Sequence, residues 1–108
     1  MAEVIWTKFA QKKRKKLYAD GVRDFGLTTA MRTASAVETI EKILAKYPET
    51  GFLEPLLQGL TPIYRARHIN KRFKLIYWYD EMNDAIVIAD IWDTRRNPQS
   101  LATRMKLK

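Results

Sequence analysis

Polar and apolar residues alternate through most of the second half of the chain, a period of two that is typical of half-buried β-strands. Two turn-forming segments interrupt this alternation, Asn70–Lys71 and the acidic stretch from Asp80 to Asp84. Segments joined by such short turns pair as consecutive antiparallel strands. The predicted strands span about residues 62–69, 72–79 and 85–92.

The first half of the chain has a different period, because its apolar residues recur every three or four positions. This spacing predicts two amphipathic helices that pack as an antiparallel pair, one starting near Lys8 and one capped by Thr28. Gly26 is expected to end the first helix and Pro48 the second. A short apolar segment at residues 2–6 predicts a strand before them. The order strand, two helices and three strands indicates an α+β fold, with all 108 residues in one domain.

The first predicted hairpin gathers cations on one side. If Asn70 and Lys71 form a two-residue turn, Arg65, Arg67 and Lys74 share a face, and Arg67 lies directly opposite Lys74. Like charges opposite each other cost about 0.2–1 kcal/mol, a cost that a bound anion would relieve. We interpret this face as the working surface; the alternative is an ordinary solvated strand face.

The second turn decides which residues lie beside these cations. If the loop at 80–84 holds five residues, Tyr77 lies opposite Val87 and His68 faces the core. The apolar side chains expected on the basic side are then Ile76, Trp78, Ile86 and Ile88. An exposed apolar patch of this kind indicates contact with a protein partner. Beyond the last strand, only a short turn through Leu101 is expected, with residues 104–108 as a fraying basic tail.

The charge balance points to an anionic partner. The chain carries a net charge of +8 at pH 7 and a pI near 9.9, which favours nucleic acid, an acidic protein or a membrane surface. The run KKRKK at residues 12–16 has no large apolar face in phase with it, so membrane binding is the least favoured. We interpret this run as the solvated side of the first helix rather than as a docking site.

Composition excludes several chemistries. The chain has no cysteine and a single histidine, so disulfides, thiol nucleophiles and cysteine zinc sites are excluded, and neither a metal site nor a cofactor is expected. No apolar run is long enough to span a bilayer, and the first ten residues do not resemble a signal peptide. The cytoplasm is therefore the expected compartment.

The order of predicted elements, together with the segments YRARHINKRFKLIYWYDE and IADIWDTRRNP, resembles the RelE/ParE superfamily of bacterial toxins. The resemblance covers nearly the whole chain, and its most specific parts are GLTPIYRAR, FKLIYWYD and DTRRNP. It implies a small antiparallel sheet curled around an N-terminal helical hairpin. It also implies neutralisation by a cognate antitoxin, in a type II toxin–antitoxin system.

Two activities occur in this superfamily: RelE-like members cut ribosome-bound messenger RNA, and ParE-like members inhibit DNA gyrase. The RelE pattern falls here on Arg65, Arg67, Lys74 and Arg95. The pattern also expects a tyrosine a few residues later, in the stretch that reads Asn97 to Leu101 here, and that tyrosine is missing. The DTRRNP ending is more similar to ParE-type plasmid stabilisation proteins.

These observations support three hypotheses. The favoured one is a ParE-like, growth-inhibiting toxin that blocks gyrase through protein contacts. The residues expected to bind the antitoxin or the target are Arg72, Ile76, Trp78, Ile88, Trp92 and Arg96. The alternatives are a metal-independent, ribosome-dependent endoribonuclease using the four RelE-like cations, and a non-toxic nucleic-acid-binding module of the same fold. Monomer, homodimer and toxin–antitoxin heterotetramer all remain open as assembly states.

Overall fold

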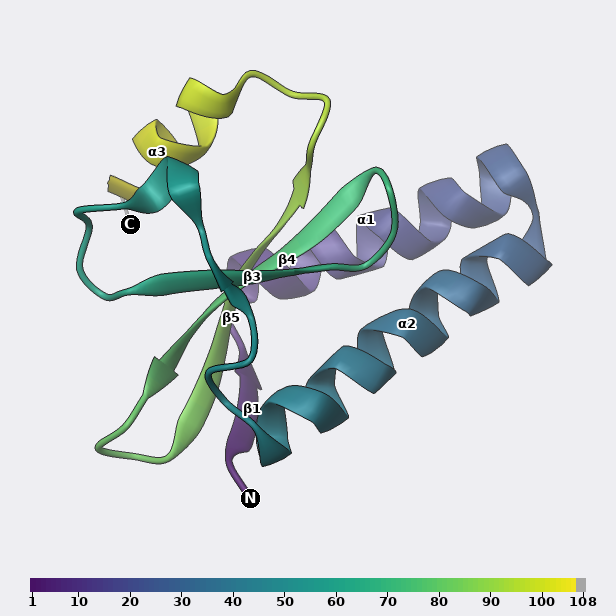
Figure 1. The fold of residues 1–108 in the computed structure, drawn as a ribbon. Helices are drawn as coiled ribbons and strands as arrows, with labels where there is room; N and C mark the ends of the chain where they lie inside the picture. Colours follow the sequence, from purple (N-terminus) through teal and green to yellow (C-terminus); the bar gives the residue numbers. More distant parts are fainter. Residues whose placement is uncertain (107–108) are drawn as a thin grey trace.

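The computed structural model describes residues 1–106 and contains a helical hairpin, a five-stranded sheet and a C-terminal helix (Figure 1). In chain order the elements are β1 (Glu3–Trp6), α1 (Lys8–Phe25), α2 (Leu27–Lys46), β2 (Phe52–Leu53), the 3-10 turn η1 (Pro55–Leu57), β3 (Tyr64–His68), β4 (Phe73–Asp80), β5 (Ala85–Asp93) and α3 (Pro98–Lys106). The predicted α+β class and the order of its main elements are confirmed.

The helical hairpin forms where the apolar period predicts it. The Thr7 side chain accepts a hydrogen bond from the Ala10 N–H at 3.1 Å and caps α1. Gly26 has a φ of 90°, a conformation that glycine adopts readily, and it alone separates the two helices. The prediction that Thr28 caps α2 is therefore wrong, because the single-residue turn lets α2 begin at Leu27.

The sheet has the strand order β1-β5-β4-β3-β2. Its β2–β3, β3–β4 and β4–β5 pairs are antiparallel, whereas β1 runs parallel to β5. The sheet is thus mixed rather than wholly antiparallel. A parallel pair needs a long crossover between its strands, and the helical hairpin lies within that crossover.

Both faces of the sheet are covered. On the helix face, side chains of β4 and β5 such as Tyr77 and Ile88 pack against α1 and α2. On the opposite face, which we call the α3 face, Ile76 and Trp92 pack against Leu57 of η1 and Leu101 of α3. Figure 1 shows α3 beside the η1 turn and the hairpin on its own side. Burial on both faces explains why β5 reads as a nearly continuous apolar run instead of an alternating one.

The predicted register of the β3–β4 hairpin is wrong by one residue. The Asn70 carboxamide oxygen accepts hydrogen bonds from the N–H groups of Arg72 and Phe73, both at 2.9 Å, and this widens the turn to three residues. Arg67 therefore lies opposite Leu75, and His68 lies opposite Lys74. Since successive side chains alternate between faces, Arg65 and Arg67 project on the helix face and Lys74 on the α3 face.

The predicted register of the β4–β5 hairpin is also wrong by one residue. Its turn holds four residues, so Asp80 pairs with Ala85 and Tyr77 with Ile88. The Tyr79 hydroxyl donates to the Asp84 carboxylate at 2.7 Å and closes the turn. This register, with a bulge after Ile76, turns the β5 isoleucines inward. The predicted apolar partner patch is therefore not formed.

Two further expectations are corrected. His68 is exposed rather than buried, and its ring lies 5.3 Å from that of Phe52. The C-terminal segment is a nine-residue helix, not a short turn with a fraying tail, because Leu101 and Met105 are buried and Arg104 forms an ion pair with Asp90. Residues 107–108 of the predicted tail lie outside the described part of the chain.

Candidate functional site

The two arginines of β3 form hydrogen bonds to the loop that precedes β2. The Arg65 guanidinium donates to the carbonyl oxygens of Glu49 and Gly51, at 3.3 and 3.0 Å. Arg67 donates to the Thr50 hydroxyl at 3.4 Å. Both predicted phosphate-binding cations thus fasten the segment before β2 to the sheet.

The same segment is held by Tyr77. Its hydroxyl donates to the Pro48 carbonyl at 2.8 Å and accepts from the Gly51 N–H at 2.9 Å. A Cβ atom at position 51 would lie 2.6 Å from the Tyr77 ring, so this close approach requires glycine. Burial raises the pKa of the Tyr77 hydroxyl, and it stays protonated in its role as donor.

Lys74 lies on the other face and is buried. Its ammonium is 2.7 Å from the Glu54 carboxylate, whose side chain has no exposed surface. Glu54 also accepts a hydrogen bond from the Leu56 N–H at 3.3 Å and thereby caps η1. The expectation that Arg65, Arg67 and Lys74 emerge together is wrong. Sequence reasoning missed Glu54, because nothing in its loop sequence indicates a buried partner.

Most residues predicted to touch a protein partner are in the core. Ile76, Ile88 and Trp92 are each at most 2% exposed, and the Arg104 guanidinium lies 5.0 Å from the centre of the Trp92 ring. Their assignment as surface contacts is corrected, since α3 and the helical hairpin cover them. Trp78 is half-buried, and its assignment stays a prediction.

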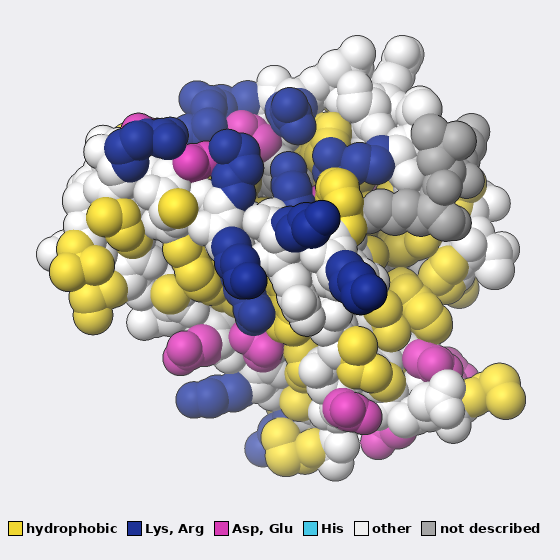
Figure 2. Space-filling model, turned by 180° about the vertical axis from the view of Figure 1, so that it is seen from behind, with side chains coloured by type: hydrophobic (Ala, Val, Ile, Leu, Met, Phe, Trp, Pro, Cys, Tyr) yellow, Lys and Arg dark blue, Asp and Glu magenta, His cyan; other side chains and the backbone are white. Residues whose placement is uncertain are grey.

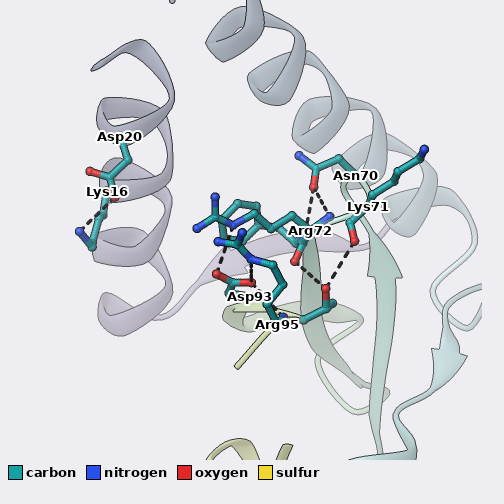
Figure 3. A network of polar contacts seen from close by, with 9 residues as sticks. Lys16, Asp20, Asn70, Lys71, Arg72, Asp93 and Arg95 are labelled. Atoms are coloured by element: carbon teal, nitrogen blue, oxygen red, sulfur yellow. Dashed lines mark hydrogen bonds and ion pairs between the residues drawn. The ribbon is translucent and has the colours of Figure 1, made fainter. Parts of the chain in front are cut away.

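Arg72, Arg95 and Arg96 lie at the surface, around the loop that joins β5 to α3. Figure 3 shows the Asp93 carboxylate between Arg72 and Arg95, whose guanidinium groups point toward α1. The Nε atoms of these arginines are 3.2 and 3.5 Å from the Asp93 oxygens. The N–H of Arg95 also donates to Asp93, at 3.0 Å. Asp93 therefore holds Arg72 and Arg95 beside each other at this loop.

Lysines of α1 join these arginines. Burial lowers the pKa of the Lys13 ammonium; Asp90 opposes this, while the positive charges of Arg104, Arg96 and Lys16 lower it further. The Lys13 ammonium therefore interacts electrostatically with Lys16, with Arg96 of the β5–α3 loop and with Arg104 of α3. Figure 2 shows lysine and arginine side chains gathered over this side of the molecule. We call this group the basic surface, and it consists of Lys13, Lys16, Arg72, Arg95, Arg96 and Arg104.

A cleft of about 410 Å³ opens on the same side, between the tip of the helical hairpin and the β3–β4 turn. Leu17, Gly21, Phe25 and Phe73 form its apolar lining, and Arg72 lies at its rim. The hairpin tip also exposes large apolar side chains: Val22, Phe25, Leu27 and Met31. The three-to-four apolar spacing of the first helix does not distinguish exposed from buried positions, so sequence reasoning missed this patch.

Asp93 makes part of this structure sensitive to pH. Burial alone would raise the pKa of its carboxyl, but hydrogen bonds from the Arg95 N–H and from both guanidinium groups outweigh it, so the pKa is lowered. A lowered folded-state pKa stabilises the fold above the unfolded value of about 3.9, and this contribution is lost as the pH falls through the folded-state pKa. The Asp93→Asn variant should thus be less stable than the native chain at about pH 6, and the gap should narrow toward about pH 3. Urea unfolding at both pH values measures the stability difference between Asp93→Asn and the native chain. A difference that does not change with pH would contradict the lowered pKa of Asp93.

No helix in residues 1–106 is long and apolar enough to cross a membrane. Within the same range, no group of three or more His, Cys, Asp or Glu side chains is placed to hold a metal ion.

Comparison with solved structures gives one consistent fold. The chain is similar to a chain of the chromosomal ParDE TA system from P. aeruginosa, with 19% identity over 86% of this chain and 96% of the other, and a TM-score of 0.66. A metal-bound toxin from Helicobacter pylori matches with 18% identity, 87% and 96% coverage, and a TM-score of 0.64. A YoeB/ParE toxin from Agrobacterium tumefaciens matches with 13% identity, 84% and 96% coverage, and a TM-score of 0.58. At these identities the likeness establishes the fold.

No curated protein sequence is significantly similar to the chain. The family model described as "ParE toxin of type II toxin-antitoxin system, parDE" matches residues 4–98, which is most of the chain. This match confirms the resemblance drawn from the YRAR and DTRRNP segments. The chain belongs to the ParE toxin family of type II toxin–antitoxin systems.

Proposed function

We propose that this toxin inhibits DNA gyrase through protein contacts, without cutting RNA, and that a cognate antitoxin neutralises it. It would act in the cytoplasm, where gyrase works on DNA. Membership of the ParE family supports a toxin with an antitoxin partner. The choice of gyrase over the ribosome rests on the arrangement of the cations.

The observation that carries this choice is the buried ion pair between Lys74 and Glu54. A metal-free ribonuclease must surround the reacting phosphate with free cations. Here Lys74 is neutralised on the α3 face, while Arg65 and Arg67 bind the loop before β2 from the helix face. Arg95 belongs to a third location, beside Asp93. The four RelE-like cations do not converge on one phosphate.

The sheet also lacks a well-placed general base for RNA cleavage. Burial raises the pKa of Tyr64 and Tyr77, and the hydrogen bond to Asp84 raises the pKa of Tyr79 to about 12. These hydroxyls stay protonated at neutral pH and cannot accept the proton of a ribose 2′-hydroxyl. His68 projects on the face opposite Arg65 and Arg67, so it cannot serve the same phosphate.

The apolar hairpin tip favours a protein target. Phe25, Leu27 and Met31 are each more than 60% exposed, and they adjoin the cleft lined by Leu17 and Phe73. An exposed apolar patch next to an apolar cleft is typical of a protein-binding surface. We assign the contact with gyrase to this tip.

A supercoiling assay tests the proposal. Purified toxin should inhibit supercoiling of a relaxed plasmid by gyrase, and added antitoxin should reverse the inhibition. Phe25→Ser should raise the inhibitory concentration at least about tenfold, because anchor residues at the centre of an interface contribute about 2 kcal/mol or more and about 1.4 kcal/mol is already tenfold. Met82→Ser is the matched control, since Met82 is 96% exposed in the distant β4–β5 turn, and it should leave inhibition unchanged.

The ribonuclease alternative has its own signature. Primer extension on translated messages would show codon-spaced breaks that disappear in the Arg95→Ala variant. Such breaks, with supercoiling unaffected, would overturn the gyrase proposal. Absence of both effects and of any growth defect on induction would favour a non-toxic nucleic-acid-binding module of the same fold.

A further inference from the structure

The gyrase contact proposed above is assigned to the hairpin tip and leaves the basic surface without a role. The basic surface joins four separate segments: Lys13 and Lys16 of α1, Arg72 of the β3–β4 turn, Arg95 and Arg96 of the β5–α3 loop, and Arg104 of α3. Lys13 and Lys16 are three residues apart and so lie on the same side of the helix. The mutual repulsion of these groups is unfavourable, and part of it lowers the pKa of Lys13. A bound polyanion would relieve it.

The acidic groups on this side do not neutralise the positive charge of the basic surface. Asp20 pairs with Lys16 at 3.0 Å, Asp93 pairs with Arg72 and Arg95, and the buried Asp90 pairs with Arg104 and also attracts Lys13. The Lys16 side chain is 72% exposed and the Arg95 side chain 64% exposed, and surface pairs of this kind exchange readily for another anion. Arg96 lies exposed beside them, and it contributes to the field at Lys13.

The chemistry around the cations selects the kind of polyanion. Apart from the hairpin tip and its cleft, where Arg72 lies at the rim, no large apolar side chain is exposed beside these cations: none of those exposed in the described chain lies within residues 8–21 or 93–106. A protein interface needs an apolar centre, and single-stranded nucleic acid needs exposed aromatic rings for base stacking. The aromatic rings nearest the cations are already covered: Arg14 lies over Trp6, and Arg104 over Phe9 and Trp92. The phosphates of a duplex can be contacted without such platforms.

The remaining neighbours suit phosphates. Beside Arg104, the first turns of α3 present the polar side chains of Asn97, Gln99, Ser100 and Thr103 around a shallow hollow. Hydroxyl and amide groups of this kind, with lysine and arginine, are the usual contacts to the DNA backbone. Contacts to phosphates carry no sequence information, so binding should not depend on sequence.

We propose that the basic surface binds the phosphate backbone of duplex DNA. If the gyrase proposal above holds, the bound duplex is a segment adjacent to the DNA that the enzyme handles, and the toxin contacts protein through the hairpin tip and DNA through the basic surface. The DNA-binding claim itself does not depend on gyrase, because it can be measured with DNA alone.

Fluorescence anisotropy with a labelled duplex of random sequence provides the test. The native chain should bind with a strong salt dependence. The Lys13→Gln/Lys16→Gln/Arg96→Gln variant should lower the slope of log K against log salt by about two to three, since each phosphate contact contributes about 0.9. Its control is Arg32→Gln/Lys42→Gln/Lys46→Gln, which removes the same charge from exposed positions on α2 and should retain most of the slope.

Each alternative outcome is decisive. Equal losses in the two triple variants would mean diffuse charge rather than a built surface and would overturn the proposal. Tighter binding to single-stranded RNA, to an acidic peptide or to anionic vesicles than to duplex DNA would also overturn it. Supercoiling assays on the same variants separate the two proposals: inhibition without DNA binding refutes only this one, and DNA binding without inhibition refutes only the gyrase target.

Discussion

Replacing Lys74 by methionine is expected to lower the free energy of unfolding by about 3–5 kcal/mol, because the fully buried Glu54 carboxylate loses its charged partner. Methionine keeps most of the lysine stem's packing, so the loss reports mainly on the uncompensated charge. Urea unfolding followed by tryptophan fluorescence measures it. The control is Lys71→Met in the exposed β3–β4 turn, which should change stability by no more than about 0.5 kcal/mol.

A second substitution separates structure from chemistry at this position. In Lys74→Met/Glu54→Gln the buried charge is gone, while the amide can still accept from the Leu56 N–H, so much of the lost stability should return. If Lys74 is purely structural, toxicity returns with stability. Restored stability with toxicity still absent would show that Lys74 acts in the toxic reaction, which the gyrase proposal excludes.

Replacing Arg104 by methionine is expected to cost about 3 kcal/mol or more, since it removes the ion-pair partner of the fully buried Asp90. The guanidinium also lies over the rings of Phe9 and Trp92 and so joins α3 to α1 and β5. Hydrogen exchange should show the amides of α3 losing protection first. This would indicate that the Asp90–Arg104 pair attaches α3 to the sheet.

Arg96 provides the control for the loss of stability expected in Arg104→Met. Arg96→Met removes the same charge from an exposed loop position and should leave α3 protected and stability within about 0.5 kcal/mol. The Arg104→Met/Asp90→Leu variant should recover stability, because it replaces the buried pair with apolar side chains. Equal losses in Arg104→Met and Arg96→Met would contradict the assigned role of Asp90.

The elements of this fold were predictable, whereas the contacts across them were not. The three-to-four spacing before Pro48 and the alternation after Tyr64 predicted both long helices and the three main strands. The turns were less certain, because Asn70 can close a two-residue or a three-residue turn, and its side-chain hydrogen bonds select the longer one. One residue of difference moved Lys74 to the other face.

The candidate site, too, was predictable only in part. Sequence reasoning identified Arg72 and Arg96 as binding residues and Arg95 as a RelE-like cation, and all three lie on the basic surface. It treated the lysines of α1 as a solvated helix side and the C-terminal residues as a tail, since nothing local indicates that α3 folds back to α1. The partners of Lys74 and Arg104 lie 20 and 14 residues away along the chain, on other elements.

The sequence by itself determined the class of fold, the toxin family and the positive charge, because periodicity, motif and composition are local or summed properties of the chain. Only the tertiary structure decided which cations are buried with a partner and which lie at the surface. That distinction depends on strand register and on the return of α3 to the sheet, and both are set by packing between residues that are far apart in the sequence.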